Sequence, residues 1–348
     1  MAPALRDKYG LSLTEIGIVL AAEWVGLTLS MLPWGFAVDR FGERWTLAGG
    51  LAVCAAFLVA SASAPSFGWL VTFLGLAGIA GGSVQSGSGR AVMRWFAASE
   101  RGLALGIRQC AVPIGGAIAA IVLPQLGSPK AGFLFIAAFV LAGAIAGALV
   151  LRSGTEEHIE VTDVEITLRD RRLWLACWAS SLYVVAQVAM MGFVVLFLHD
   201  VHGYSTGEAA AVFAVAQGLA AALRIGVGRW SDVLGSRVRP LRRIGVAIAA
   251  TLAAVAVLSN APGLVLVPAL AIATALSMAW NGLAFTIAAE LGGRRSGAAI
   301  GFQQTILSGL GVAAPVAFAA VVSASSWSLA FGLAALFPLA GAWLLRWL

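Results

Sequence analysis

The sequence predicts an all-α polytopic membrane protein, and its composition leads to that class. Of its 348 residues, 60% are hydrophobic and only 11% are charged, against roughly 25% charged residues in soluble domains. Its mean hydropathy of +0.94 is too high for a soluble core, which needs a polar surface around it. Composition therefore excludes a soluble enzyme, a nucleic-acid-binding protein and a disordered chain.

The spans are predicted from apolar runs, because a helix needs about 20 mostly apolar residues to cross a bilayer. Eleven runs meet that length, and they are continuous rather than alternating, which is typical of helices and not of barrel strands. They cover residues 14–37, 46–64, 67–89, 103–126, 131–151, 173–198, 207–230, 242–259, 262–290, 297–323 and 326–346.

The basic residues predict the orientation of these spans. Sixteen of the 22 Lys and Arg residues lie in the connections on one side and at the C-terminus, three lie on the other side and three lie within spans. Because the side rich in Lys and Arg faces the cytoplasm, the C-terminus is predicted to be cytoplasmic and the protein to reside in the cytoplasmic membrane. The net charge of +6 thus reflects membrane flanks, and no nucleic-acid partner is expected.

An internal repeat divides the chain. At an offset of 193 residues, Ser12 pairs with Ser205 and Glu15 pairs with Glu208. The same offset aligns two loops: Gly35 with Gly228, Asp39 with Asp232, Gly42 with Gly235 and Arg44 with Arg237. At an offset of 195, residues 102–109 align with residues 297–304. Charged residues are scarce in this chain, so matched Asp, Glu and Arg indicate two homologous halves.

The repeat also predicts the domain organisation. We expect an N-terminal half at residues 1–151, a cytoplasmic linker at 152–172 and a C-terminal half at 173–348. The run at 173–198 has no partner in the first half. We therefore expect two pseudo-symmetric six-helix halves with 11 of 12 transmembrane helices present, and the first helix missing from this sequence.

The aligned loops carry a family resemblance. Gly35-Phe-Ala-Val-Asp39-Arg40-Phe-Gly42-Glu-Arg44 resembles the signature loop of the major facilitator superfamily, Gly-x-x-x-Asp-Arg-x-Gly-x-Arg/Lys. The loop from Gly228 to Arg237 is similar but degenerate. With the number of spans and the central linker, the resemblance covers essentially the whole chain. It implies the fold of that superfamily and transport by alternating access of the two halves.

The resemblance implies a cytoplasmic gate at the two loops. Asp39 is expected to lie where the span at 297–323 begins, since an anion complements a helix N-terminus, and this contact would hold the halves together. The alternative is an ordinary turn with membrane-surface charges. We expect Glu290 to pair with Arg294 or Arg295 at the same end. The gate residues are Gly35, Asp39, Arg40, Gly42, Arg44, Gly228, Asp232, Gly235 and Arg237.

Arg108 is the main candidate for substrate binding. A charged side chain inside a span is costly, so each one is a functional candidate, and Arg108 lies about two turns into the span at 103–126. Beside it we expect Gln109 and, through the repeat, Gln303 and Gln304. An arginine holds a carboxylate through two parallel hydrogen bonds, which favours a small organic anion. The alternative is that Arg108 reaches the cytoplasm or pairs at the gate.

Further polar residues complete the predicted cavity. The resemblance implies that the spans at 67–89, 173–198 and 262–290 line it, which adds Gln85, Tyr183, Gln187, Trp280 and Asn281. The alternative is that these side chains only join helices. Glu23 is a candidate for proton coupling, or else a partner for the missing helix. Arg90 and Arg224 are weaker candidates for substrate contact, since both can reach the cytoplasm from their spans.

The predicted function is therefore secondary active transport, and we favour uptake of a small organic anion. One alternative is a proton-driven efflux pump for drugs or metabolites, and another is a truncated or sensor protein that does not transport. The expected partners are a small-molecule substrate, the lipid bilayer and a coupling proton, and the protein is expected to be a monomer. No enzyme, nucleotide-binding or zinc motif is present, so neither catalysis nor a cofactor is predicted. His199 and His202 share a short loop without further ligands, so no metal is expected.

Overall fold

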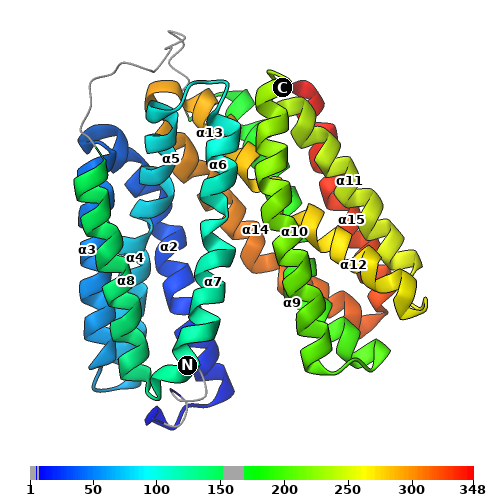
Figure 1. Cartoon of the computed structure of the whole chain (residues 1–348), viewed down its shortest axis with the longest axis horizontal. Helices are drawn as coiled ribbons and strands as arrows, with labels where there is room; N and C mark the ends of the chain where they lie inside the picture. Colours follow the sequence, from blue (N-terminus) through cyan, green and yellow to red (C-terminus); the bar gives the residue numbers. More distant parts are fainter. Residues whose placement is uncertain (1–4, 6–7, 152–167) are drawn as a thin grey trace. The chain divides into compact units, whose positions relative to one another are not determined.

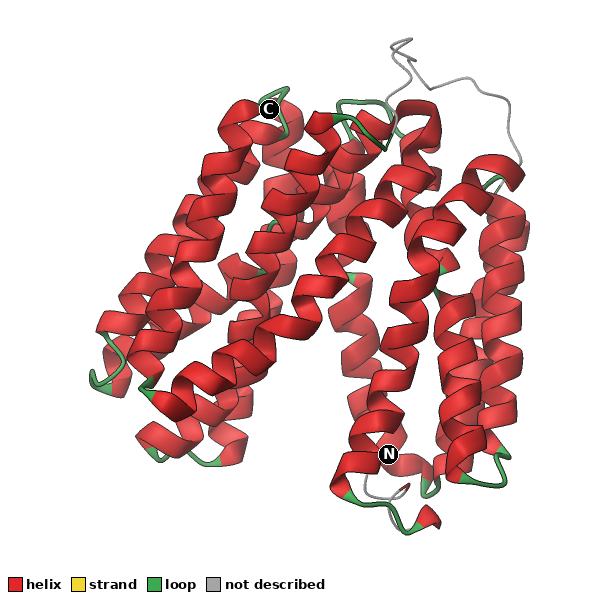
Figure 2. Ribbon diagram, turned by 180° about the vertical axis from the view of Figure 1, so that it is seen from behind, coloured by secondary structure: helices red, strands yellow, loops and turns green. Residues whose placement is uncertain are grey.

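The computed structural model describes residue 5 and residues 8–151 and 168–348. Every regular element in this part of the chain is a helix, as Figure 2 shows. The predicted all-α class is confirmed. Most of the predicted linker at 152–172 lies outside the described residues.

Contacts between backbones divide the chain into two compact units, which we describe separately. Unit 1 contains the described residues of Met1–Trp95, Ile114–Ile166 and Gly292–Thr305, and unit 2 contains those of Phe96–Pro113, Thr167–Leu291 and Ile306–Leu348. Two short segments, 96–113 and 292–305, thus belong with the other half of the sequence. The predicted domain boundaries remain a prediction.

Unit 1 is built mainly from helices of the first sequence half (Figure 1). Helices α2 and α4 pack against each other, as do α3 and α8, and their core holds Leu58, Leu70, Leu74 and Phe133. Its elements are α2 (Leu13–Phe41), α3 (Glu43–Ala62), α4 (Phe67–Gly81), α5 (Ser83–Trp95), most of α7 (Ala111–Val122), η1 (Leu123–Leu126), α8 (Pro129–Val150), η2 (Gly293–Arg295) and the start of α14 (Ser296–Ala324).

Unit 2 has α9 near its centre, packed against α10, α12 and α15. Fourteen residues of α9 are buried, which explains why its apolar residues surround the whole helix. Its elements are α6 (Arg101–Gln109), α9 (Arg171–His202), α10 (Thr206–Val233), α11 (Val238–Val257), α12 (Gly263–Ser277), α13 (Asn281–Gly292), the rest of α14, α15 (Trp327–Leu344) and η3 (Leu345–Trp347).

The repeat pairs begin equivalent helices in the same way. Ser12 accepts a hydrogen bond from the Glu15 backbone N–H at 3.2 Å, and the Glu15 carboxylate accepts one from the Ser12 backbone N–H at 2.8 Å. Ser205 and Glu208 form the same capping box at the start of α10. Such a box satisfies two N–H groups that a helix start leaves without partners.

Three predicted spans are interrupted in the structure. Gly82 separates α4 from α5, Cys110 separates α6 from α7, and residues 278–280 separate α12 from α13. Among the described residues, nine helical stretches are long and apolar enough to cross a membrane. One of them, Gly263–Ala324, spans 62 residues and contains two predicted spans, while α6 and α7 are each too short to qualify. The count of eleven remains a prediction.

Candidate functional site

Asp39, near the end of α2, binds the start of α14 within unit 1. Its carboxylate accepts hydrogen bonds from the backbone N–H groups of Gly297 at 3.0 Å and Ala298 at 2.8 Å. These groups belong to the first turn of a helix, where the N–H groups lack helical partners and the dipole favours an anion. The predicted position of Asp39 at this helix start is confirmed.

We call the contact between the Asp39 carboxylate and the start of α14 the Asp39 anchor. Arg90 on α5 also takes part in it. Its Nη1 donates to the Asp39 carboxylate and to the Arg294 carbonyl, the latter at 2.9 Å. Its Nε lies 3.9 Å from Glu43, which is buried and also pairs with Arg94 at 2.9 Å. The position of Arg90 near the cytoplasmic end of its predicted span did not predict this cluster of two carboxylates and two arginines.

The contact between α2 and α14 depends on glycine. A Cβ atom built on Gly35 would lie 2.5 Å from the Gly297 carbonyl oxygen, closer than real side chains approach backbone. The two backbones therefore meet directly, and this brings Asp39, one turn further on, to the end of α14. Small residues permit such close helix approach inside membranes.

Unit 2 repeats the arrangement with Asp232 on α10. Its carboxylate accepts hydrogen bonds from the N–H groups of Gly102 at 3.0 Å and Leu103 at 2.8 Å, at the start of α6. A Cβ atom built on Gly228 would lie 2.7 Å from the Gly102 carbonyl carbon. Each loop of the repeat therefore binds the first turn of one helix from the other sequence half.

The cation beside Asp232 comes from its own loop. Arg237 donates to Asp232 and to Ser231 Oγ, the latter at 2.8 Å, and its Nε lies 3.2 Å from Glu290. The structure thus pairs Glu290 with Arg237, and its predicted pairing with Arg294 or Arg295 remains a prediction.

The remaining gate residues have local roles. Gly42 and Gly235 have φ angles of 79° and 60°, a left-handed conformation that glycine adopts without strain. Arg44 donates from Nε to the Ala148 carbonyl at 2.7 Å. Arg40 is exposed, with its guanidinium over the Phe41 ring at 5.4 Å.

A polar cluster lies within unit 2 around the end of α6. Arg108 donates from Nη1 to the Gln109 side-chain oxygen at 2.8 Å, and its guanidinium lies 4.8 Å from the centre of the Phe285 ring on α13. Such a cation–π contact stabilises a desolvated guanidinium. Arg108 and Gln109 are thus together, as predicted.

Arg224 on α10 connects this pair to the break in α12. Its Nε donates to the Met278 carbonyl and its Nη1 to the Gln109 carbonyl, both at 3.0 Å. The Met278 carbonyl also accepts from Asn281 Nδ2 at 3.1 Å, and the same Asn281 amide donates to Gln187 at 3.0 Å. The structure therefore joins three predicted cavity residues, Gln109, Gln187 and Asn281, through the contacts of Arg224. The sequence indicates Arg224 only as a weaker candidate for substrate contact.

Tyr183 and Trp280 lie in the core of unit 2, 0% and 1% exposed. The Tyr183 hydroxyl donates to the Leu241 carbonyl at 3.2 Å, and Trp280 Nε1 donates to the Ser277 carbonyl at 2.8 Å. The two rings meet edge to face with centroids 5.9 Å apart. Their polar atoms are satisfied by backbone, so their surroundings are those of packing residues.

Four other predicted residues lie in unit 1. Gln85 is half-buried on α5, Gln303 and Gln304 are buried on the first part of α14, and Glu23 is exposed on α2. Within the described residues, no group of three or more His, Cys, Asp and Glu side chains could hold a metal ion.

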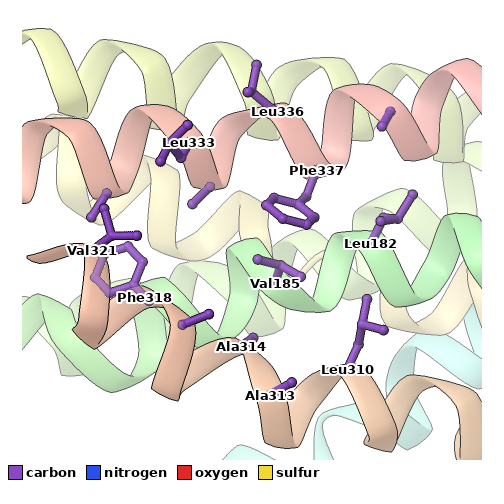
Figure 3. A pocket seen from close by; sticks show the side chains of 14 residues that line it. Leu182, Val185, Leu310, Ala313, Ala314, Phe318, Val321, Leu333, Leu336 and Phe337 are labelled. Carbon is purple, nitrogen blue, oxygen red and sulfur yellow. The ribbon is translucent and has the colours of Figure 1, made fainter.

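Unit 2 also contains an apolar cavity of about 610 Å³ between α9, α14 and α15 (Figure 3). Alanines on α14 and α15 leave the space, and Leu310, Phe318 and Phe337 form walls around it. Every side chain that lines it is hydrocarbon. It is therefore suited to an apolar group and not to an anion.

A family model described as Major Facilitator Superfamily matches residues 1–315. The chain belongs to the major facilitator superfamily. It is similar to an uncharacterized MFS-type transporter of Mycobacterium tuberculosis, with 34% identity over 347 residues, which covers 98% of this chain and 78% of the relative. It is also similar to the hexuronate transporter of Bacillus subtilis, with 29% identity over 140 residues, which covers 40% of this chain and 32% of the relative.

Solved transporter structures share the fold. The fucose:proton symporter of Escherichia coli matches with a TM-score of 0.75 at 17% identity, covering 96% of this chain and 91% of that chain. The predicted family and fold are therefore confirmed. This member of the superfamily is a multi-pass membrane protein of a transporter family and not of an enzyme family.

Proposed function

We propose that this protein is a secondary transporter that takes up a small organic anion by alternating access. The observation that carries the proposal is Arg108, whose guanidinium lies over the Phe285 ring and donates to the Gln109 side chain. A guanidinium is suited to bind a carboxylate through two parallel hydrogen bonds. The similarity to a hexuronate transporter supports a carboxylate substrate.

In this proposal, neutral amides surround Arg108 and select the substrate. Gln109, Gln187 and Asn281 supply donors and acceptors for a polar body, and Gln85, Gln303 and Gln304 remain cavity residues predicted from the sequence alone. We leave Tyr183 and Trp280 out of the cavity because both are buried with backbone partners. The protein resides in the cytoplasmic membrane with its C-terminus inside, according to the distribution of Lys and Arg, and it acts as a monomer in this proposal.

The two aspartate anchors form the cytoplasmic gate of this transporter. Asp39 and Asp232 each accept two backbone N–H groups from the start of a helix of the other sequence half. Release of these carboxylates would free both helix starts during inward opening. Glu23 carries the coupling proton in this proposal.

The first test is uptake of radiolabelled D-glucuronate, a hexuronate, into proteoliposomes. We expect Arg108→Gln to lower uptake at least tenfold, because hydrogen bonds to a charged group contribute about 1.5–3 kcal/mol and 1.4 kcal/mol corresponds to tenfold. Arg229→Gln is the matched control, since Arg229 is exposed at the end of α10. Unchanged uptake by Arg108→Gln, or no uptake of any small carboxylate by the unsubstituted protein, contradicts the proposal.

The apolar cavity supports a second candidate, efflux of apolar compounds. Ala313→Phe would fill the cavity from α14. If the protein exports apolar compounds through this cavity, we expect this variant to slow Nile red extrusion severalfold without changing D-glucuronate uptake. The reason is that the added ring occupies space that the dye would need. Ala320→Phe is the control, because Ala320 is exposed on the same helix and does not line the cavity. Equal extrusion by both variants rules out this cavity as the binding site.

A further inference from the structure

Arg224 is a buried cation in the middle of α10 whose partners are carbonyl groups. It is 6% exposed, and it donates to the carbonyls of Gln109 and Met278, both at 3.0 Å. Among the described residues, no carboxylate lies within ion-pair distance of it. A charge buried inside a membrane protein needs compensation, so the source of that compensation must be found in these carbonyls.

Both carbonyls lie at the C-terminal ends of helices. Gln109 is the last residue of α6, and Met278 is the C-cap of α12. The last carbonyls of a helix have no helical partners, so both can accept from the guanidinium. Arg224 therefore finds its hydrogen-bond partners in backbone that the two helix breaks leave open.

The same two contacts hold the polar cluster together. The Gln109 backbone that Arg224 binds carries the side chain that accepts from Arg108. The Met278 carbonyl that Arg224 binds is shared with Asn281, which reaches Gln187. The backbones of α6 and α10 also meet here, since a Cβ atom on Gly106 would lie 2.5 Å from the Arg224 carbonyl oxygen.

We propose that Arg224 is a positioning residue that clamps the ends of α6 and α12, and thereby fixes Arg108, Gln109 and Asn281 for the substrate. The role of Arg224 in substrate binding rests on the proposed anion transport. The clamp on α6 and α12 is independent of that proposal. A planar guanidinium places two donors on two separate carbonyls, and a lysine ammonium is a point charge on a flexible stem. Arg224→Lys is therefore expected to fail as Arg224→Gln does.

Cys110 reports on the clamp without any substrate. It follows Gln109 at the break between α6 and α7, and it is 6% exposed with Sγ 3.7 Å from the Ala221 carbonyl of α10. In protein whose only cysteine is Cys110, we expect Arg224→Lys and Arg224→Gln to speed N-ethylmaleimide labelling about tenfold or more. The same two substitutions are made in protein whose only cysteine is Cys177, which is buried in α9. We expect its slow labelling rate to stay unchanged, because local release near Cys110 does not expose α9, whereas unfolding would.

Uptake of D-glucuronate tests the positioning role. We expect both Arg224 variants to raise KM about tenfold, while Arg229→Gln leaves labelling and KM unchanged. An unchanged rate of Cys110 labelling in both Arg224 variants overturns the clamp. A rate in Arg224→Lys equal to that of the unsubstituted protein also overturns it, since a positive charge alone would then suffice. Faster labelling with an unchanged KM overturns the positioning role. If the unsubstituted protein takes up no carboxylate, the proposed function fails while the labelling result still decides the clamp.

Discussion

Gly228→Val is expected to abolish transport and to lower the midpoint of thermal unfolding by about 2–12 °C. Its Cβ atom would lie 2.7 Å from the Gly102 carbonyl carbon, which is backbone and cannot rotate away as a side chain can. Overpacking costs typically 1–3 kcal/mol, and 1 kcal/mol corresponds to roughly 2–4 °C in domains of 150–250 residues. The displaced α6 would also withdraw the Gly102 and Leu103 N–H groups from Asp232.

Gly226→Val is the matched control for this variant. Gly226 lies two residues earlier on α10, and a Cβ atom there would meet nothing within 4 Å. Both variants add the same β-branched side chain to the same helix, so the difference between them isolates the contact with α6. Equal unfolding midpoints for the two variants would show that α6 and α10 do not meet at Gly228. Fluorescence of a thiol-reactive dye during heating measures the unfolding midpoints of both variants.

Local features of the fold could be predicted from the sequence because their causes are local. Ser12 and Glu15 are three residues apart, as are Ser205 and Glu208, and a capping box needs only that spacing. The aligned loops likewise place an aspartate four residues after a glycine, so one helical turn separates the close contact from the anchor. The repeat aligns Asp39 with Asp232, and in the structure each accepts from two backbone N–H groups at a helix start.

The contacts of Arg90 and Arg224 could not be predicted in this way. Arg90 binds Asp39, 51 residues away, and Arg224 binds Gln109, 115 residues away. At the repeat offsets Arg90 aligns with apolar residues at 283–285, so symmetry gives no indication of its role. The helix breaks at Gly82, Cys110 and Met278 were missed because each lies inside an apolar run that is long enough to form one span.

The difference between the two anchors leads to a second prediction, that Asp39→Asn destabilises the protein more than Asp232→Asn. Removing one partner of a buried ion pair costs about 3–5 kcal/mol, because the other charge is left buried. Arg237 would keep Glu290 at 3.2 Å after the loss of Asp232. Among the described residues, Arg90 would keep the Arg294 carbonyl at 2.9 Å and one carboxylate, Glu43 at 3.9 Å, which is already paired with Arg94.

The thermal unfolding midpoints of Asp39→Asn, Asp232→Asn and a control variant show which aspartate contributes more to stability. Asp200→Asn is the control, because Asp200 is exposed at the end of α9, and we expect its midpoint to equal that of the unsubstituted protein. The double variant Asp39→Asn with Arg90→Gln is expected to recover part of the loss, since it removes the buried charge that the single variant leaves behind. A larger loss from Asp232→Asn, or no recovery in the double variant, would mean that Arg90 is stabilised by groups other than Asp39. Such a result would place the main anchor at Asp232, where the arginine comes from the loop itself.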